Sequence, residues 1–172
     1  TDSSAGKIIK IDRISLKKKI ISKGHRNPQG LFLNKNQNIL ISTEHGPKGG
    51  DEINLIKIDQ NLVQNFGWPV SSYGNHYDAV PINSYTKKFA PLNKSHKKYG
   101  FIEPIKYFEN SLGISEIIQN YYTNNSFFIT SLKNETIYDM FGDKKYKKYG
   151  DDKRKKLDKY DVKKLPQFIQ DN

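Results

Sequence analysis

Residues 24–31 read GHRNPQGL, and residues 43–52 read TEHGPKGGDE. Each stretch lies at the end of an apolar run and places charged and amide side chains beside glycine and proline, which favour sharp turns. A packed core has little use for this mixture, because buried polar groups need partners. The two stretches instead predict loops of a site that binds an anionic, oxygen-rich ligand and a hard cation.

The sequence around these loops alternates between short apolar runs and turn residues, which is typical of β-strands. Along 52–58, Ile53 and Leu55 fall on one face and Asn54 and Ile56 on the other. Strands are expected at 7–12, 17–22, 31–33, 39–42, 52–58, 127–132 and 136–138, with order also at 102–108 and 113–118. Residues 73–99 lack periodicity and are expected to be a functional surface loop or poorly ordered. No helical period of useful length appears before residue 140, so the sequence predicts an all-β sandwich, barrel or propeller.

The composition narrows the function classes without choosing among them. The 172 residues carry a formal net charge of +11, no cysteine and 35% apolar residues. The absence of cysteine excludes disulfides and thiolate metal sites, and the absence of an apolar run of about 18 residues predicts no membrane insertion. The positive charge would suit nucleic acid, a membrane surface or an acidic ligand, and equally a solvated surface.

Arg26, Asn27 and Gln29 are the candidate ligand-binding residues of the first stretch. Arg26 offers a fork of N–H donors that suits carboxylates, and the two amides offer both donors and acceptors. Pro28 and Gly30 would shape a tight turn that directs all three side chains one way. The alternative is an ordinary polar turn between strands.

The second stretch has the composition of a cation site. The backbone carbonyls of Gly46 and Pro47 would be exposed in an irregular loop, with the carboxylates of Glu44, Asp51 and Glu52 nearby. Hard cations such as Ca²⁺ bind mixed sets of oxygen ligands of this kind. The alternative is an acidic hairpin loop without a ligand.

Four segments in order connect these residues to a known family. They read RNPQG at 26–30, EHGPKGGDEIN at 44–54, NFGWP at 65–69 and SYG at 72–74. This order closely resembles the soluble quinoprotein sugar dehydrogenases, the glucose/sorbosone dehydrogenase family that uses pyrroloquinoline quinone (PQQ). The family pattern runs R-N-P-Q-G, E-H-G-P-x-G-G-D-E-x-N, N-Y-G-W-P and S-Y-G. A later S-L-K segment at 131–133 supports the resemblance, which covers roughly residues 20–140.

The resemblance implies a six-bladed β-propeller with PQQ on its axial face. A four-stranded blade takes about 40–50 residues, so residues 1–142 would supply about two to three blades of a partial propeller. Arg26 and Lys133 would neutralise carboxylates of PQQ, and Asn27 and Gln29 would hydrogen-bond the cofactor or the substrate. Residues 143–172 would form a separate Lys-rich tail, helical or disordered.

The resemblance also implies calcium chemistry. The carbonyls of Gly46 and Pro47 would hold a Ca²⁺ that binds the quinone and acts as a Lewis acid. Glu52 and the backbone of Phe66 match a second Ca²⁺ site found in some relatives. The Glu52–Phe66 spacing is longer here than in the family, and Phe replaces Tyr. A backbone ligand survives that replacement, whereas the longer loop puts the geometry of this second site in doubt.

The implied reaction is oxidation of an aldose at its anomeric carbon to the lactone, with a histidine taking the hydroxyl proton. This general-base histidine is expected upstream of Thr1, because His25, His45, His76 and His96 do not match its position. Cofactor-binding arginines that normally follow the S-L-K segment are also missing. The chain is therefore expected to be a fragment of a larger propeller and inactive alone.

The resemblance further implies an aldose substrate, an external electron acceptor, a periplasmic or secreted location, and a homodimer in the full-length protein. The chain shows no signal peptide, but it begins with Thr1 rather than Met. One alternative is a non-catalytic propeller-type ligand-binding module that keeps the loops and has lost the chemistry. Another is nucleic-acid binding through Tyr146, Tyr149 and Tyr160 among the lysines of the tail. Acidic residues interrupt the tail and no nucleic-acid motif appears, so no nucleic-acid partner is expected.

Overall fold

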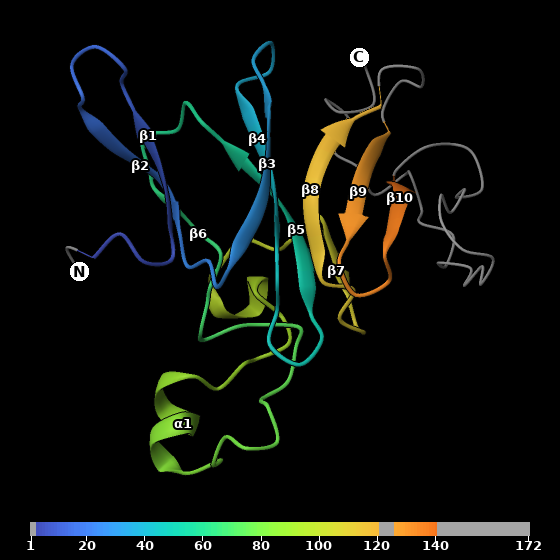
Figure 1. The fold of residues 1–172 in the computed structure, drawn as a ribbon. Helices are drawn as coiled ribbons and strands as arrows, with labels where there is room; N and C mark the ends of the chain where they lie inside the picture. The colour runs from blue at the N-terminus through green and yellow to red at the C-terminus, as the bar shows by residue number, and fades with distance from the viewer. Residues whose placement is uncertain (1–2, 121–125, 141–172) are drawn as a thin grey trace.

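Figure 1 shows a computed structural model of the chain, which describes residues 3–120 and 126–140. The described residues form ten strands in three sheets, with one short α-helix and one 3₁₀ turn. The all-β prediction is therefore confirmed. The expected tail at 143–172 lies outside the described residues.

The first sheet has the order β1-β2-β6 and the second has the order β3-β4-β5-β7. The first consists of β1 (Lys7–Ile11), β2 (Lys18–Lys23) and β6 (Gln64–Asn65), and β6 runs parallel to β2. The second consists of β3 (Pro28–Asn34), β4 (Ile39–Glu44), β5 (Asp51–Lys57) and β7 (Lys106–Phe108), all antiparallel. Strands were expected within one or two residues of most of these bounds, although β7 covers only the end of the ordered segment expected at 102–108.

The third sheet is an antiparallel meander of β8 (Ile114–Gln119), β9 (Phe127–Ser131) and β10 (Thr136–Met140). Its first strand, β8, contacts β3 and β4, whereas β2 contacts β5. The second sheet therefore lies between the other two, and the three sheets follow one another like blades (Figure 1). The expectation of two to three blades is met by one four-stranded sheet and two three-stranded sheets in the described part of the chain.

The second and third sheets repeat a structural detail without sharing sequence. In both, the first strand shifts register near its start, at β3 between Pro28 and Leu31 and at β8 between Ile114 and Ile117. A threonine of the next strand then accepts a backbone N–H of the shifted segment. Thr43 Oγ1 accepts from Gly30 at 2.9 Å, and Thr130 Oγ1 accepts from Glu116 at 2.9 Å. Each first strand thus begins with a register shift at the same end of the sheets.

Alternation along β4 and β5 divides their side chains between two interfaces, because successive strand residues point to opposite faces. Ile41 and Ile53 pack in a cluster with residues of the third sheet, including Ile114 and Ile129. On the opposite face, Ile56 packs in a second cluster with residues of the first sheet and the loop that follows it, Ile8, Ile21 and Phe66. The two faces predicted for 52–58 are confirmed by these clusters.

Residues 73–99 are described throughout and include helix α1 (Ser84–Phe89) and a 3₁₀ turn η1 (Lys97–Tyr99). The side chain of Asn83 caps α1 by accepting the N–H of Thr86 at 3.0 Å. The helix buries none of its residues, so it carries no apolar stripe and its sequence shows no helical period. No helix in the described residues is long and apolar enough to cross a membrane.

Candidate functional site

The two opening stretches meet at one end of the three sheets. Residues 24–27 connect β2 to β3, and residues 45–50 connect β4 to β5. The N–H of His45 donates to the carbonyl of Asn27 at 3.1 Å, and the N–H of Arg26 donates to Glu44 Oε2 at 3.2 Å. Because β3 and β4 are antiparallel neighbours, the start of one strand and the end of the other lie together.

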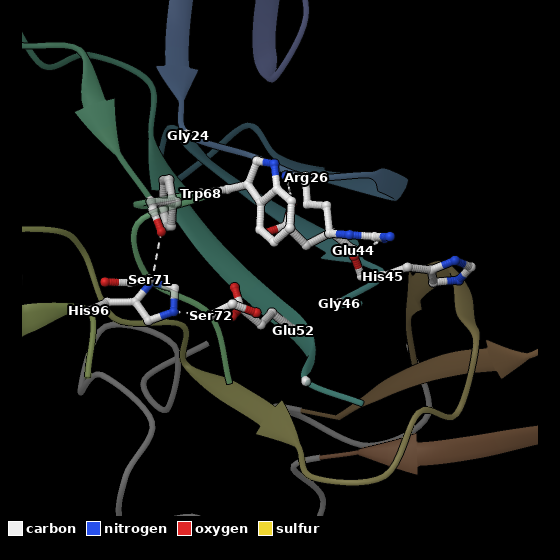
Figure 2. A pocket seen from close by; sticks show the side chains of 12 residues that line it. Gly24, Arg26, Glu44, His45, Gly46, Glu52, Trp68, Ser71, Ser72 and His96 are labelled. Atoms are coloured by element: carbon white, nitrogen blue, oxygen red, sulfur yellow. Dashed lines mark hydrogen bonds and ion pairs between the residues drawn. The ribbon is translucent and has the colours of Figure 1, made fainter. Parts of the chain in front are cut away.

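The guanidinium group of Arg26 is fixed by contacts with His45 and Tyr77 at this end of the sheets. Its Nη1 donates to the carbonyl of His45 at 3.0 Å, and its Nη2 lies 3.4 Å from the hydroxyl of Tyr77. The guanidinium carbon lies 5.4 Å from the centre of the Trp68 ring, and Figure 2 shows the two side chains next to each other. A guanidinium stacked on an indole is pre-organised and keeps several N–H donors for an anion.

Asn27 and Gln29 are exposed beside Arg26. Gln29 Nε2 donates to Asn27 Oδ1 at 3.0 Å, so the two amides lie on the same side of the backbone. The tight turn expected at Pro28 and Gly30 is wrong, because both residues lie in strand β3, where Pro28 pairs with Glu44 of β4 and the register shifts before Leu31. The role of the three donor side chains of the first stretch as cofactor ligands stays a prediction.

The loop 45–50 folds back on itself so tightly that glycine is required. A Cβ on Gly46 would lie 2.2 Å from the carbonyl oxygen of Gly49, and a Cβ on Gly50, with φ +70°, would lie 2.0 Å from the backbone nitrogen of Gly74. Within the described residues, the carbonyls of Gly46 and Pro47 accept no hydrogen bond. Two successive backbone oxygens without donors suit a hard cation.

The carboxylate of Asp51 binds backbone N–H groups and does not lie open to a cation. Its Oδ2 accepts the N–H groups of Leu112 at 2.9 Å and Gly113 at 2.7 Å, and its Oδ1 accepts the N–H of Gly46 at 3.2 Å. The side chain is fully buried. The expectation that Asp51 lies near a cation is therefore replaced by a structural role, in which its carboxylate joins the loop of the second sheet to the third sheet.

Lys133 lies in the turn between β9 and β10, and it is exposed. The same end of the third sheet contacts the second sheet, because His45 Nε2 lies 2.6 Å from the carbonyl of Ile114. The backbone N–H of Lys133 donates to the carbonyl of Leu112 at 3.3 Å, next to the segment that Asp51 holds. Lys133 thus belongs to the loops at the site end, although it comes from a different sheet than Arg26.

Beneath the loops lies a buried layer of two carboxylates and two histidines. Glu44 and Glu52 are opposite each other on β4 and β5, and Asn54 Nδ2 reaches both, at 3.0 Å and 3.4 Å. His25 Nδ1 lies 3.3 Å from Glu44, and His96 Nε2 lies 3.2 Å from Glu52. Figure 2 shows Glu44 and Glu52 pointing into the space beside Arg26 and Trp68, with His96 on the other side.

Sequence reasoning missed the roles of His25 and His96. A signal did exist for the carboxylates, because the face assigned to Asn54 and Ile56 also contains Glu52 by simple alternation. No comparable signal exists for His96, which reaches the layer from the irregular segment after α1. Its position depends on the path of a long connection rather than on any local pattern.

The second pair titrates as a unit. Burial raises the pKa of Glu52 by disfavouring its charged form, although the contact with His96 opposes this. Burial lowers the pKa of His96, but the interactions with Glu52 and the Phe66 carbonyl outweigh it, so the net direction is upward. His96 Nε2 makes no hydrogen bond within the described residues, so its contact with Glu52 Oε1 at 3.2 Å is electrostatic.

Glu52 and Phe66, expected to bind a second Ca²⁺, both contact the same imidazole. His96 Nδ1 donates to the carbonyl of Phe66 at 2.7 Å, while its Nε2 faces Glu52. The nearby cavity has a volume of only about 10 Å³, room for the centre of about one water-sized group. Glu44, Gly46, Glu52, Phe66 and His96 are among its lining residues. No cluster of three or more His, Cys, Asp or Glu suited to a metal occurs in residues 3–120 and 126–140.

The fold and the loops define a class of protein, a β-propeller with a sugar-dehydrogenase motif set on one end of its blades. The family model described as Glucose / Sorbosone dehydrogenase matches residues 4–160. The chain belongs to this family. The match extends beyond residues 20–140, the part covered by the short motifs.

Curated relatives are much longer than this chain. It is 34% identical over 134 residues to aldose sugar dehydrogenase YliI of Escherichia coli (strain K12), covering 73% of this chain and 32% of that protein. It is 42% identical over 79 residues to quinoprotein glucose dehydrogenase B of Acinetobacter calcoaceticus, covering 45% of this chain and 15% of that protein. The chain thus spans about a third or less of the length of these relatives.

Solved structures support the same fold. A crystal structure of a glucose dehydrogenase matches with a TM-score of 0.58 at 29% identity, covering 78% of this chain and 40% of that chain. The apo-form of the soluble aldose sugar dehydrogenase from Escherichia coli matches with a TM-score of 0.55 at 29% identity, covering 81% and 39%. The three sheets are therefore blades of a partial β-propeller.

Proposed function

We propose that this chain forms one side of a PQQ- and Ca²⁺-dependent site that oxidises an aldose at the anomeric carbon to the lactone. The observation that carries the proposal is the cavity that Arg26 and Gly46 line together, in a loop where the carbonyls of Gly46 and Pro47 accept no hydrogen bond within the described residues. Cation ligands and anion ligands on one rigid surface match a cofactor that carries carboxylates and binds a metal. The quinoprotein name of one relative supports the same cofactor.

The residues present fit the cofactor chemically. Arg26 would bind a carboxylate with the N–H donors that His45 and Tyr77 leave available, and Lys133 would bind another as a point charge. Asn27 and Gln29 would hydrogen-bond the cofactor or the sugar. The rigid loop around Gly46 would hold Ca²⁺ through backbone oxygens, which need no reorganisation when the ion arrives.

When bound, PQQ would supply the hydride acceptor for the anomeric carbon, and an external acceptor would take up the two electrons that the hydride carries. This chain's residues would position the cofactor and exclude water on one side. The proton from the sugar hydroxyl needs a general base. His25, His45 and His96 already contact protein partners, so none of these three is free for the task. We expect the base on a part of the propeller other than these blades, and we expect this chain alone to bind without turnover.

Calorimetric titration of PQQ into the chain, with and without Ca²⁺, tests the assignment. Arg26→Ala and Lys133→Ala should each weaken PQQ binding about 10–100-fold, since a charge-assisted hydrogen bond contributes about 1.5–3 kcal/mol. Lys35→Ala is the matched control, because Lys35 is exposed in the β3–β4 turn at the other end of the sheet. Unchanged affinity in both site variants would exclude this cofactor site.

A second outcome distinguishes catalysis from simple binding. A longer chain that completes the propeller should oxidise glucose with an artificial electron acceptor and lose that activity when chelator removes Ca²⁺. Binding of PQQ without activity in the complete propeller would favour the non-catalytic module. The periplasmic or secreted location and the homodimer of the full-length protein are further proposals, tested by fractionation and by light scattering of that longer chain.

A further inference from the structure

The imidazole of His96 lies between the two groups that resemblance assigns to a second Ca²⁺. Its Nδ1 donates to the carbonyl of Phe66 at 2.7 Å, and its Nε2 lies 3.2 Å from Glu52 Oε1. The other carboxylate oxygen of Glu52 faces the amide nitrogen of Asn54 at 3.4 Å. Each oxygen expected to ligate the ion therefore already contacts a nitrogen of this chain.

These contacts are incompatible with a calcium ligand set at the same place. Ca²⁺ binds 6–8 oxygen atoms at 2.3–2.6 Å, so two of its ligands lie at most about 5 Å apart. Here the ring of His96 stands between the carbonyl of Phe66 and Oε1 of Glu52, with one ring nitrogen against each oxygen.

His96 is held in this position by more than its two ring contacts. The residue is 1% exposed. Its ring stacks on Tyr73 with centroids 5.3 Å apart, and its carbonyl accepts the N–H groups of Tyr99 and Phe101. Tyr73 stacks in turn on Tyr107 with centroids 3.6 Å apart, which places an aromatic ladder behind the imidazole. The ring cannot leave without disturbing the backbone and this ladder.

We propose that His96 occupies the second cation position, and that this chain binds no divalent cation between Glu52 and Phe66. The imidazole joins the carboxylate of β5 to the backbone of the loop after β6, a connection that the ion would otherwise make. This inference concerns a site separate from the Gly46–Pro47 carbonyls and does not depend on PQQ binding.

The test counts Ca²⁺ ions bound by the full chain in the absence of PQQ, after chelator treatment. Wild type and Glu52→Gln are compared by calorimetry, with circular dichroism to confirm folding. The inference predicts the same number of ions for both proteins. One more ion bound by wild type than by Glu52→Gln would overturn it.

A second variant keeps the test decisive if Glu52→Gln does not fold. His96→Ala should gain one Ca²⁺ relative to wild type and should gain melting temperature when Ca²⁺ is added, because the opened space then contains free oxygen ligands. His76→Ala is the matched control and should bind the same number of ions as wild type. A folded His96→Ala that gains no Ca²⁺ would contradict the inference. Because PQQ is absent throughout, these results are independent of the cofactor titration.

Discussion

Replacing Asp51 with Asn should destabilise the chain strongly, because one carboxylate joins two sheets. Oδ2 accepts the N–H groups of Leu112 and Gly113 at 2.9 Å and 2.7 Å, and Oδ1 accepts that of Gly46 at 3.2 Å. Asn retains one acceptor oxygen and places an NH₂ group against a backbone donor. Two hydrogen bonds to a charged acceptor are then lost or weakened, each contributing about 1.5–3 kcal/mol.

The expected loss in free energy of unfolding is about 3–6 kcal/mol, a large part of the roughly 5–15 kcal/mol typical of a folded domain. Urea unfolding followed by Trp68 fluorescence measures it, with an unchanged dependence on urea showing that the unfolded state is comparable. Asp59→Asn is the control, because Asp59 is exposed in the turn after β5, and it should change stability by less than about 0.5 kcal/mol. An equally small effect for Asp51→Asn would refute the reasoning.

Three further predictions concern the backbone, the core and pH. Gly50→Ala should cost several kcal/mol more than Gly100→Ala in urea unfolding, because both have positive φ but only Gly50 lacks space for a Cβ; equal losses would contradict this. Ile129→Ala, at 1% exposure between the second and third sheets, should cost about 2–5 kcal/mol, and a loss under about 1 kcal/mol would show a loosely packed interface. Burial raises the pKa of Glu103, but hydrogen bonds from a backbone N–H, a tyrosine and a serine outweigh it and the net pKa is lowered. Its contribution is therefore full above the unfolded pKa of about 4.3 and is lost as pH falls through the lower folded value, so Glu103→Gln should lose stability less steeply than wild type between about pH 5 and pH 3.

Much of the strand arrangement was predictable because strand signals are local. Alternation in 52–58 gave the correct faces of β5, and turn residues separated the strands of both hairpins correctly. Helix α1 could not be predicted in this way, because a six-residue helix without buried residues leaves no periodic pattern. Turn chemistry was misleading at Pro28 and Gly30, because pairing with β4 draws both residues into strand β3.

By itself, the sequence determined the β-strand content, the two loops with their glycines, and membership of a family that those loops identify. Only the tertiary structure decided which carboxylate accepts backbone N–H groups and which one faces a histidine. Asp51 and Glu52 are adjacent in sequence, yet strand alternation sends one to the third sheet as a backbone acceptor and the other toward His96. Gly113, whose N–H Asp51 accepts, and His96, which Glu52 contacts, both lie more than 40 residues away in the chain. No local pattern specifies such pairs, because they form only when packing of the sheets brings distant loops to the same end of the propeller.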